Sequence, residues 1–279
     1  MAKTTLELID VEKSFGSVIA NSGINVKVDA STVTCILGDN GAGKSTLIKT
    51  LSGVHKPTKG KYLVEGVEVN FNSPRDALDA GIATVFQDLA TIPLMSIWRN
   101  FFIGNEVEMG FGPFKWLDVK KMKEITKQEL LAMGIDLRDP NQPIGTLSGG
   151  ERQAVAIARA VYFGAKVLIL DEPTSALGVR QSGIVLKYVL AAKERGIAVI
   201  FITHNPNHAF LVGDRFYLLN RGKLIQSMER STANIDELTK AMAGGKDLEL
   251  LTTEIESVRK ATPAPAKKAP AKKVPASKK

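Results

Sequence analysis

The sequence predicts an α/β fold with a mixed, mainly parallel core sheet, an N-terminal antiparallel β subdomain and an inserted helical subdomain. Three observations support this prediction. The runs VTCIL, KVLIL and AVIFIT are apolar throughout and alternate with helical patterns, which is typical of parallel strands covered on both faces. The N-terminal residues instead alternate apolar and polar side chains. A stretch in the middle of the chain has mostly helical spacing.

The N-terminal segment, to about Val33, contains TLELIDV and GINVKVD, whose alternation predicts half-buried antiparallel strands. From Thr32 the chain becomes continuously strand-like in TVTCIL and runs directly into a glycine-rich loop. The helical pattern STLIKTLSG follows the loop, and Gly53 is its expected stop. The predicted order is strand, loop, helix.

A β-rich stretch, GKYLVEGVEV, precedes a second core strand, IATVFQ, which ends at Gln87. Residues from about 88 to 147 then look mostly helical, and we interpret them as an inserted subdomain. Asp118 is the expected cap of one helix there, and Gly134 its expected end. The apolar positions of this helix recur near helical spacing at Val119, Met122, Ile125, Leu130 and Met133.

The α/β alternation then resumes. A helix is expected from Ser148 to about Phe163, followed by the strand KVLIL, a helix from about Arg180 to Arg195 ended by Gly196, and the strand AVIFIT. The strands FYLLN and KLIQSM, joined by a turn at Arg221 and Gly222, and the short helix IDELTKAMA complete the predicted domain, residues 1–256. Residues 257–279 are an Ala, Lys and Pro tail with too little apolar surface to fold.

Composition excludes several classes of protein. No window approaches the roughly 18 uncharged apolar residues of a membrane-spanning helix, and the N-terminus lacks the pattern of a secretory signal. The only cysteine, Cys35, lies in an apolar run and is expected to be buried. The formal charge of +8 equals the charge of the tail alone, which has no acids after Ser257 and carries Arg259, Lys260, Lys267, Lys268, Lys272, Lys273, Lys278 and Lys279. The folded part is therefore neutral, and this location of the charge argues against a general role in nucleic-acid binding.

The loop GDNGAGKS fits the pattern GxxxxGK[ST], a phosphate-binding motif. Its glycines let consecutive backbone amides curl around phosphate, the lysine reaches the β and γ phosphates, and the hydroxyl ligates Mg²⁺. The alternative is a glycine turn that ends in a surface lysine, but the strand before the loop and the helix after it favour the phosphate site. The residues expected to contact phosphate are Gly38, Asp39, Asn40, Gly41, Ala42, Gly43, Lys44, Ser45 and Thr46.

Polar residues follow three of the predicted strands. Asp171 and Glu172 follow VLIL, and their types suit the two carboxylate tasks of phosphate hydrolysis: Asp171 holds the metal, and Glu172 orients or deprotonates water. Alone, such a pair marks the exposed end of any buried strand. Gln87 and His204 also follow strands, where open α/β sheets bind ligands.

The run LSGGERQ, Leu147 to Gln153, provides a second anion site, because Ser148 can cap its helix while Gly149 and Gly150 expose backbone amides. This run resembles the signature of the ABC transporter ATPases. The resemblance extends from about Leu6 to Ala243, because the chain also contains the phosphate loop, Gln87, Asp171 with Glu172, and His204. The resemblance implies that ATP and Mg²⁺ are the cofactors, and that the signature binds the γ-phosphate of ATP held by a second cassette.

The resemblance also implies individual roles. Gln87 touches the metal together with Ser45 and Asp171, touches the attacking water and senses the transporter, whereas His204 contacts the γ-phosphate. Phe15, in KSFG, stacks on adenine, with core packing as the alternative. His55 and His208 match no motif and are expected to be surface residues.

One departure from the wider family points to a branch of it. The common loop SALD is here Ser175 to Gly178, so its acidic residue is absent. SALGVRQ and QDLATIPLMSIWRNFFIG are, however, similar to the ribose- and fructose-type sugar importers. This resemblance implies an ATP-hydrolysing importer subunit at the cytoplasmic face of the cell membrane, peripheral, working as a homodimer with separate permease subunits and, indirectly, an extracytoplasmic sugar-binding protein.

Two other functions are weighed against this one. The first is a soluble ABC ATPase acting on nucleic acid or ribosomes through the basic tail, but the coiled coils or second cassette of such members are not in this sequence. The second is a regulator that binds without hydrolysis, which Asp171, Glu172 and His204 disfavour.

Overall fold

Six strands form the core sheet of the protein, in the order β12-β11-β3-β10-β9-β6. Five neighbouring strands run parallel, namely β11, β3, β10, β9 and β6, whereas β12 pairs antiparallel with β11. The bounds are β3 Val33–Leu37, β6 Ile82–Val85, β9 Val167–Asp171, β10 Ala198–Thr203, β11 Arg215–Asn220 and β12 Lys223–Glu229. The predicted mixed, mainly parallel sheet is confirmed.

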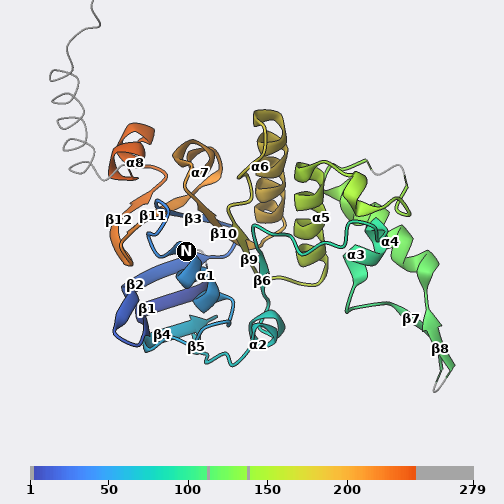
Figure 1. The fold of residues 1–279 in the computed structure, drawn as a ribbon, viewed down its shortest axis with the longest axis horizontal. Helices are drawn as coiled ribbons and strands as arrows, with labels where there is room; N and C mark the ends of the chain where they lie inside the picture. Colours follow the sequence, from blue (N-terminus) through green and yellow to red (C-terminus); the bar gives the residue numbers. More distant parts are fainter. Residues whose placement is uncertain (1–2, 112–113, 137–138, 243–279) are drawn as a thin grey trace, which may run out of the picture. The chain divides into compact units, whose positions relative to one another are not determined.

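The structure is a computed structural model that describes residues 3–111, 114–136 and 139–242 (Figure 1). These residues lie in one compact unit, Met1–Met242. The expected domain end at residue 256 and the expected tail lie outside the described residues, so both remain predictions. Within the described ranges, no helix is long and apolar enough to cross a membrane.

Alternate side chains of the core strands enter two apolar clusters, which explains why these strands are apolar throughout. In β3, for example, Val33, Cys35 and Leu37 belong to one cluster and Ile36 to the other. Burial raises the pKa of the Cys35 thiol, as expected for a cysteine that packs as a small apolar side chain.

The N-terminal strands form a separate antiparallel sheet, in the order β2-β1-β4-β5. Leu6 and Leu8 of β1 alternate with more exposed residues, and they join one face of the core sheet in a single cluster that also contains Leu47. The predicted β subdomain is confirmed, with β1 Thr4–Phe15, β2 Val18–Asp29, β4 Lys59–Val64 and β5 Val67–Glu68.

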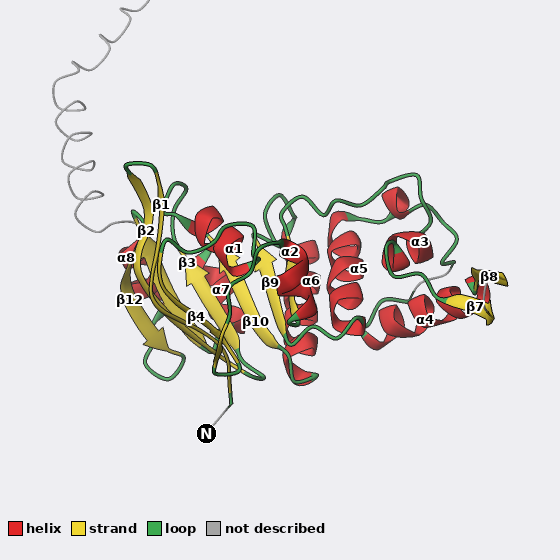
Figure 2. Ribbon diagram, turned by 90° about the horizontal axis from the view of Figure 1, so that it is seen from below, coloured by secondary structure: helices red, strands yellow, loops and turns green. Residues whose placement is uncertain are grey.

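Helices from residue 149 onward cover the other face of the core sheet (Figures 1 and 2). The predicted helices are present as α1 Lys44–Leu51, α5 Gly149–Tyr162, α6 Val179–Glu194 and α8 Ile235–Met242. Two short helices were not predicted, α2 Pro74–Asp79 and α7 Pro206–Val212. Each begins with a proline after a polar cap, Ser73 or Asn205, whose side chain accepts backbone N–H groups.

The inserted subdomain contains α3 Ile97–Phe102, a 3₁₀ turn at Ile144–Thr146 and α4 Val119–Ala132. Asp118 caps α4 by accepting the N–H of Lys121 at 3.0 Å, and Gly134 follows the helix with a φ of +84°, as predicted. The description of this region as mostly helical is incomplete. A hairpin, β7 Glu108–Phe111 and β8 Phe114–Leu117, lies between α3 and α4, and its four-residue strands are too short to show a period.

Candidate functional site

An open pocket of about 580 Å³ lies where the phosphate loop meets the carboxyl ends of β6 and β9. It brings together most of the predicted site residues, although they come from distant parts of the chain. It is lined by Val18, Ile19, Ala20, Asp39, Asn40, Gly41, Gly43, Lys44, Ser45, Thr46, Gln87, Asp171, Glu172, Arg221 and Gly222. Sequence reasoning missed the lining residues from β2 and from the turn after β11, because only the fold brings them to the loop.

The glycines of the loop are required by their surroundings. Gly43 has a φ of +102°, a conformation that residues with a Cβ rarely adopt, and an added Cβ would lie 2.7 Å from Nδ2 of Asn21. A Cβ at Gly38 would collide with the carbonyl oxygen of Leu219. Only glycine therefore lets the loop pack against both β2 and β11.

Lys44 is the first residue of α1 and is only 8% exposed. Its Nζ donates to the carbonyl oxygens of Gly38, at 2.6 Å, and Asp39, at 3.1 Å. The same atom lies 3.5 Å from Oε1 of Glu172. The loop thus holds a buried positive charge next to the carboxyl end of β9.

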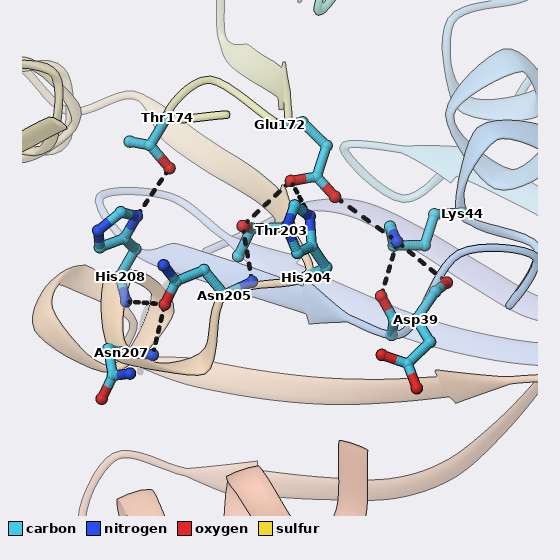
Figure 3. A network of polar contacts seen from close by, with 10 residues as sticks. Asp39, Lys44, Glu172, Thr174, Thr203, His204, Asn205, Asn207 and His208 are labelled. Carbon is cyan, nitrogen blue, oxygen red and sulfur yellow. Dashed lines mark hydrogen bonds and ion pairs between the residues drawn. The ribbon is translucent and has the colours of Figure 1, made fainter. Parts of the chain in front are cut away.

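The carboxylate of Glu172 connects three parts of the site (Figure 3). Its Oε1 faces Lys44, while its Oε2 accepts the hydroxyl of Thr203 at 3.2 Å and lies 2.9 Å from Nδ1 of His204. Glu172 is 8% exposed and has a φ of +47°, which is uncommon for a residue with a side chain. Such strain persists where the surroundings hold a side chain in place, and it often marks functional sites.

Asp171 is the last residue of β9 and also lines the pocket. Burial raises the pKa of its carboxyl group, and the negative charge of Glu172 adds to this rise, whereas Lys44 opposes it. A cation beside Asp171 would counter both causes of the rise. Ser45 and Gln87 line the same pocket, so oxygens of three kinds that bind Mg²⁺ are available there.

The histidines outside the motifs are not the plain surface residues that were expected. His208 is half-buried, and its Nδ1 lies 2.9 Å from Oγ1 of Thr174 (Figure 3). Burial lowers the pKa of His208, and the nearby His204 lowers it further. His55 is half-buried as well and meets the ring of Phe15 edge-on, with 5.1 Å between centroids.

Phe15 lies at the end of β1 with its side chain 46% exposed. It is not among the residues that line the pocket, although its neighbours Val18 and Ile19 are. Lys13 lies over its ring at 5.0 Å. An exposed aromatic ring beside the pocket fits a stacking role, which stays a prediction.

The signature residues lie at the start of α5 and do not line this pocket. Ser148 caps the helix in a reciprocal pair with Glu151, whose Oε2 accepts the N–H of Ser148 at 2.7 Å. A Cβ on Gly149 would lie 2.7 Å from a methyl carbon of Leu177, so the signature packs against the loop that precedes α6. Gly178, in that loop, has open space around it and a negative φ, so neither packing nor backbone requires glycine there.

This chain is similar to proteins of the ABC transporter family. The family described as ABC transporter matches residues 21–175. The xylose/arabinose import ATP-binding protein XylG of Sulfolobus acidocaldarius is 46% identical over 237 residues, which cover 85% of this chain and 93% of that protein. The fructose import ATP-binding protein FrcA of Rhizobium meliloti is 38% identical, covering 84% and 92%. A putative ribose/galactose/methyl galactoside import ATP-binding protein of Halalkalibacterium halodurans is also 38% identical, but this chain spans only 45% of its length.

Solved structures show the same architecture. The ADP conformation of MJ1267, an ATP-binding cassette of an ABC transporter, superimposes with a TM-score of 0.75 at 25% identity, over 89% of this chain and 98% of that one. The dimeric structure of MJ0796, a bacterial ABC transporter cassette, gives a TM-score of 0.67 at 24% identity over 81% and 98%, a likeness of fold.

Proposed function

Because this chain belongs to the ABC transporter family and is an ATPase, we propose that it powers the uptake of a sugar through a separate membrane permease. The observation that carries the chemistry is the position of Glu172. Its carboxylate lies between the lysine of the phosphate loop and His204, at the edge of a pocket large enough for a nucleotide.

ATP is the substrate in this proposal. Its phosphates lie along residues Gly38 to Thr46, where backbone amides and the N-terminus of α1 favour anions. Lys44 then exchanges its contacts with the loop carbonyls for the β and γ phosphates. The adenine stacks on Phe15, which supplies an exposed ring beside the pocket.

Mg²⁺ is the expected metal, held by Ser45, Asp171 and Gln87 together with phosphate oxygens and water. Bound Mg²⁺ would neutralise part of the negative charge on the phosphates. The raised pKa of Asp171 fits this role, because a carboxylate that is costly to charge on its own gains most from a bound cation.

Hydrolysis requires a water molecule in line with the γ-phosphate. Glu172 orients this water and accepts its proton as the new bond to phosphorus forms and the bond between phosphorus and the bridging oxygen breaks. Thr203 and His204 hold the receiving carboxylate from one side, which limits its rotation. His204, with an exposed side chain, also contacts the γ-phosphate.

The signature needs a second copy of the chain. Ser148 is exposed, and the signature residues are absent from the lining of their own pocket, so a head-to-tail homodimer lets each signature reach the ATP held by the other copy. The dimeric cassette among the structures of similar fold supports this arrangement.

The permease contact is proposed at a second, mainly apolar pocket of about 290 Å³ beside Gln87. It lies between β6, α3 and α5, and Phe86, Ile103 and Phe163 leave large apolar surfaces exposed there. Its wall includes Asp88, the residue after Gln87. Movement of a partner in this pocket would therefore shift Gln87, which contacts the metal and the attacking water in this proposal. The chain is then a peripheral subunit at the cytoplasmic face of the membrane, and a sugar-binding protein contacts the permease from outside.

Recovery of the tagged full chain from native membranes, followed by mass spectrometry, tests this function. We expect integral-membrane permease subunits and an extracytoplasmic sugar-binding protein in the purified complex. Recovery of ribosomes or nucleic acid instead, with no permease, would favour the soluble ABC ATPase alternative.

A further inference from the structure

The hairpin β7–β8 gathers four large apolar side chains on one of its two faces. Met109 pairs with Trp116 and Phe111 with Phe114, so these four side chains project from the same face of the hairpin. The alternate pairs, Gly110 with Lys115 and Glu108 with Leu117, occupy the other face. On that face an ion pair of 2.9 Å joins Lys115 and Glu108.

We call the four residues Met109, Phe111, Phe114 and Trp116 the aromatic face. Their exposed fractions are 44%, 93%, 75% and 58%, so much of this face is open to solvent in the described part of the chain. The following helix α4 instead buries Met122 and Leu130 completely. A two-stranded hairpin is marginally stable alone, and an apolar patch of this kind marks an interaction site.

The position of the hairpin favours a broad surface as its partner. Figures 1 and 2 both show β7 and β8 at the end of the inserted subdomain farthest from the core sheet. Phe111 and Phe114 form the last pair of the two strands and are the most exposed members of the aromatic face. A projecting hairpin of this kind can insert its exposed side chains a short way into a deformable surface.

The lysines next to the hairpin favour lipid over protein as its partner. Between residues 106 and 127 the acids are Glu106, Glu108, Asp118 and Glu124, and the lysines are Lys115, Lys120, Lys121, Lys123 and Lys127. Lys115 is paired with Glu108, whereas the other four lysines lie together in α4. Lysine is depleted in protein interfaces, whereas lysine together with tryptophan and phenylalanine is typical of segments that lie in the headgroup region of anionic bilayers.

We propose that the aromatic face inserts into the surface of an anionic lipid bilayer, while the neighbouring lysines contact the headgroups. This inference rests on the proposed function, which keeps the chain beside a membrane. It adds a direct lipid contact, made by the inserted subdomain, to the contact with the permease.

The chain provides its own probe for this contact. It has two tryptophans, of which Trp98 is 6% exposed and Trp116 lies on the aromatic face. In the full-length Trp98→Phe variant, emission reports on Trp116 alone. With vesicles of phosphatidylcholine and phosphatidylserine we expect a blue shift, and quenching when the lipids carry brominated acyl chains. Vesicles of phosphatidylcholine alone should give a much smaller shift.

A second variant separates the hairpin from other membrane contacts. Phe111→Ser with Phe114→Ser, in the Trp98→Phe background, should lose the shift and the quenching but keep the same ATPase activity and circular dichroism. The matched control is Val67→Ser with Ile225→Ser, two exposed apolar positions on other strands, and it should keep both signals.

Three outcomes would overturn the lipid contact: no shift of Trp116 with anionic vesicles, a shift that survives the Phe111 and Phe114 substitutions, or a shift only when the vesicles contain the permease. The last outcome would identify a protein partner instead. Because recovery of the permease is measured separately, a failed Trp116 signal with the permease present counts against the lipid contact alone, and a missing permease counts against the proposed function.

Discussion

Lys44 and Glu172 form a buried ion pair, with Nζ of the lysine 3.5 Å from Oε1 of the glutamate and about a tenth or less of each side chain exposed. The pair joins the phosphate loop to the carboxyl end of β9 directly. Removing one charge from a buried pair leaves the other charge uncompensated. The role of Glu172 is therefore best tested by a substitution that keeps the shape of its side chain.

Glu172→Gln is expected to retain ATP binding and to lose nearly all hydrolysis, a fall of about 10²-fold or more in kcat. The amide keeps the size and most hydrogen bonds of the carboxylate but cannot accept the proton of water. ATP should then hold the dimer closed. Size-exclusion chromatography with Mg·ATP tests the dimer, and phosphate release tests turnover. A variant that stays monomeric or hydrolyses ATP at close to the normal rate would contradict these assignments.

Ser148→Arg and Lys44→Ala are each expected to abolish ATPase activity, the first by blocking the signature surface and the second by removing the phosphate contact. A heterodimer of the two variants places both lesions in one composite site and leaves the other site intact. Part of the activity should therefore return if the signature acts on the partner's ATP. Two different affinity tags, purified in sequence, isolate the heterodimer for the assay.

Homodimers of each variant, purified in the same way, are the controls for this mixing experiment. Inactive heterodimers of confirmed composition would argue against a signature that acts in trans, because the proposed head-to-tail arrangement leaves one composite site of the heterodimer free of substitutions.

Gly178→Asp is expected to fold and to stabilise the protein by about 0.5 kcal/mol. Gly178 caps α6 without a side chain, its φ is negative, and a Cβ there meets no neighbour. An aspartate could accept backbone N–H groups of the first turn and would place a negative charge at the helix N-terminus. Urea unfolding measures the change, with Gly178→Ala as the control without a cap. Destabilisation by the aspartate alone would mean that this loop has less space than the structure shows.

The sequence predicted the core strands and the polar residues that meet at their ends, because both depend on local signals. Strands buried on both faces are apolar throughout, and the polar residue after each strand marks the ligand edge of the sheet. The hairpin β7–β8 and the helices α2 and α7 escaped prediction because each is short: the strands contain only two periods of alternation, and the helices contain less than two turns. The contacts of Glu172 with Thr203 and of His208 with Thr174 depend on neighbouring segments in the fold, and no spacing along the chain contains that information.

His208 matches no motif and was expected at the surface. In the fold, Asn205 caps the start of α7, and His208 lies against Thr174. Thr174 belongs to the segment that follows Glu172, so the contact ties α7 to the chain just beyond the carboxylate for which we propose the catalytic role.

His208→Gln is therefore expected to bind ATP normally but to lower kcat several-fold, since neither His208 nor Thr174 lines the nucleotide pocket.

His208→Gln should also alter the pH dependence of stability. The pKa of His208 is below its ordinary value of 6.5 in the folded chain, because of burial and the facing His204, so the folded state takes up a proton less readily than the unfolded state. The contribution of His208 is complete above about pH 6.5 and is lost as the pH falls through its lower folded pKa. Urea unfolding from pH 7.5 down to about pH 5 should thus show a steeper loss of stability in the wild type than in His208→Gln. His55→Gln is the matched control, because its histidine is equally half-buried but lies against Phe15 instead. Parallel pH profiles for the wild type and His208→Gln would show that the Thr174 contact does not depend on the neutral imidazole.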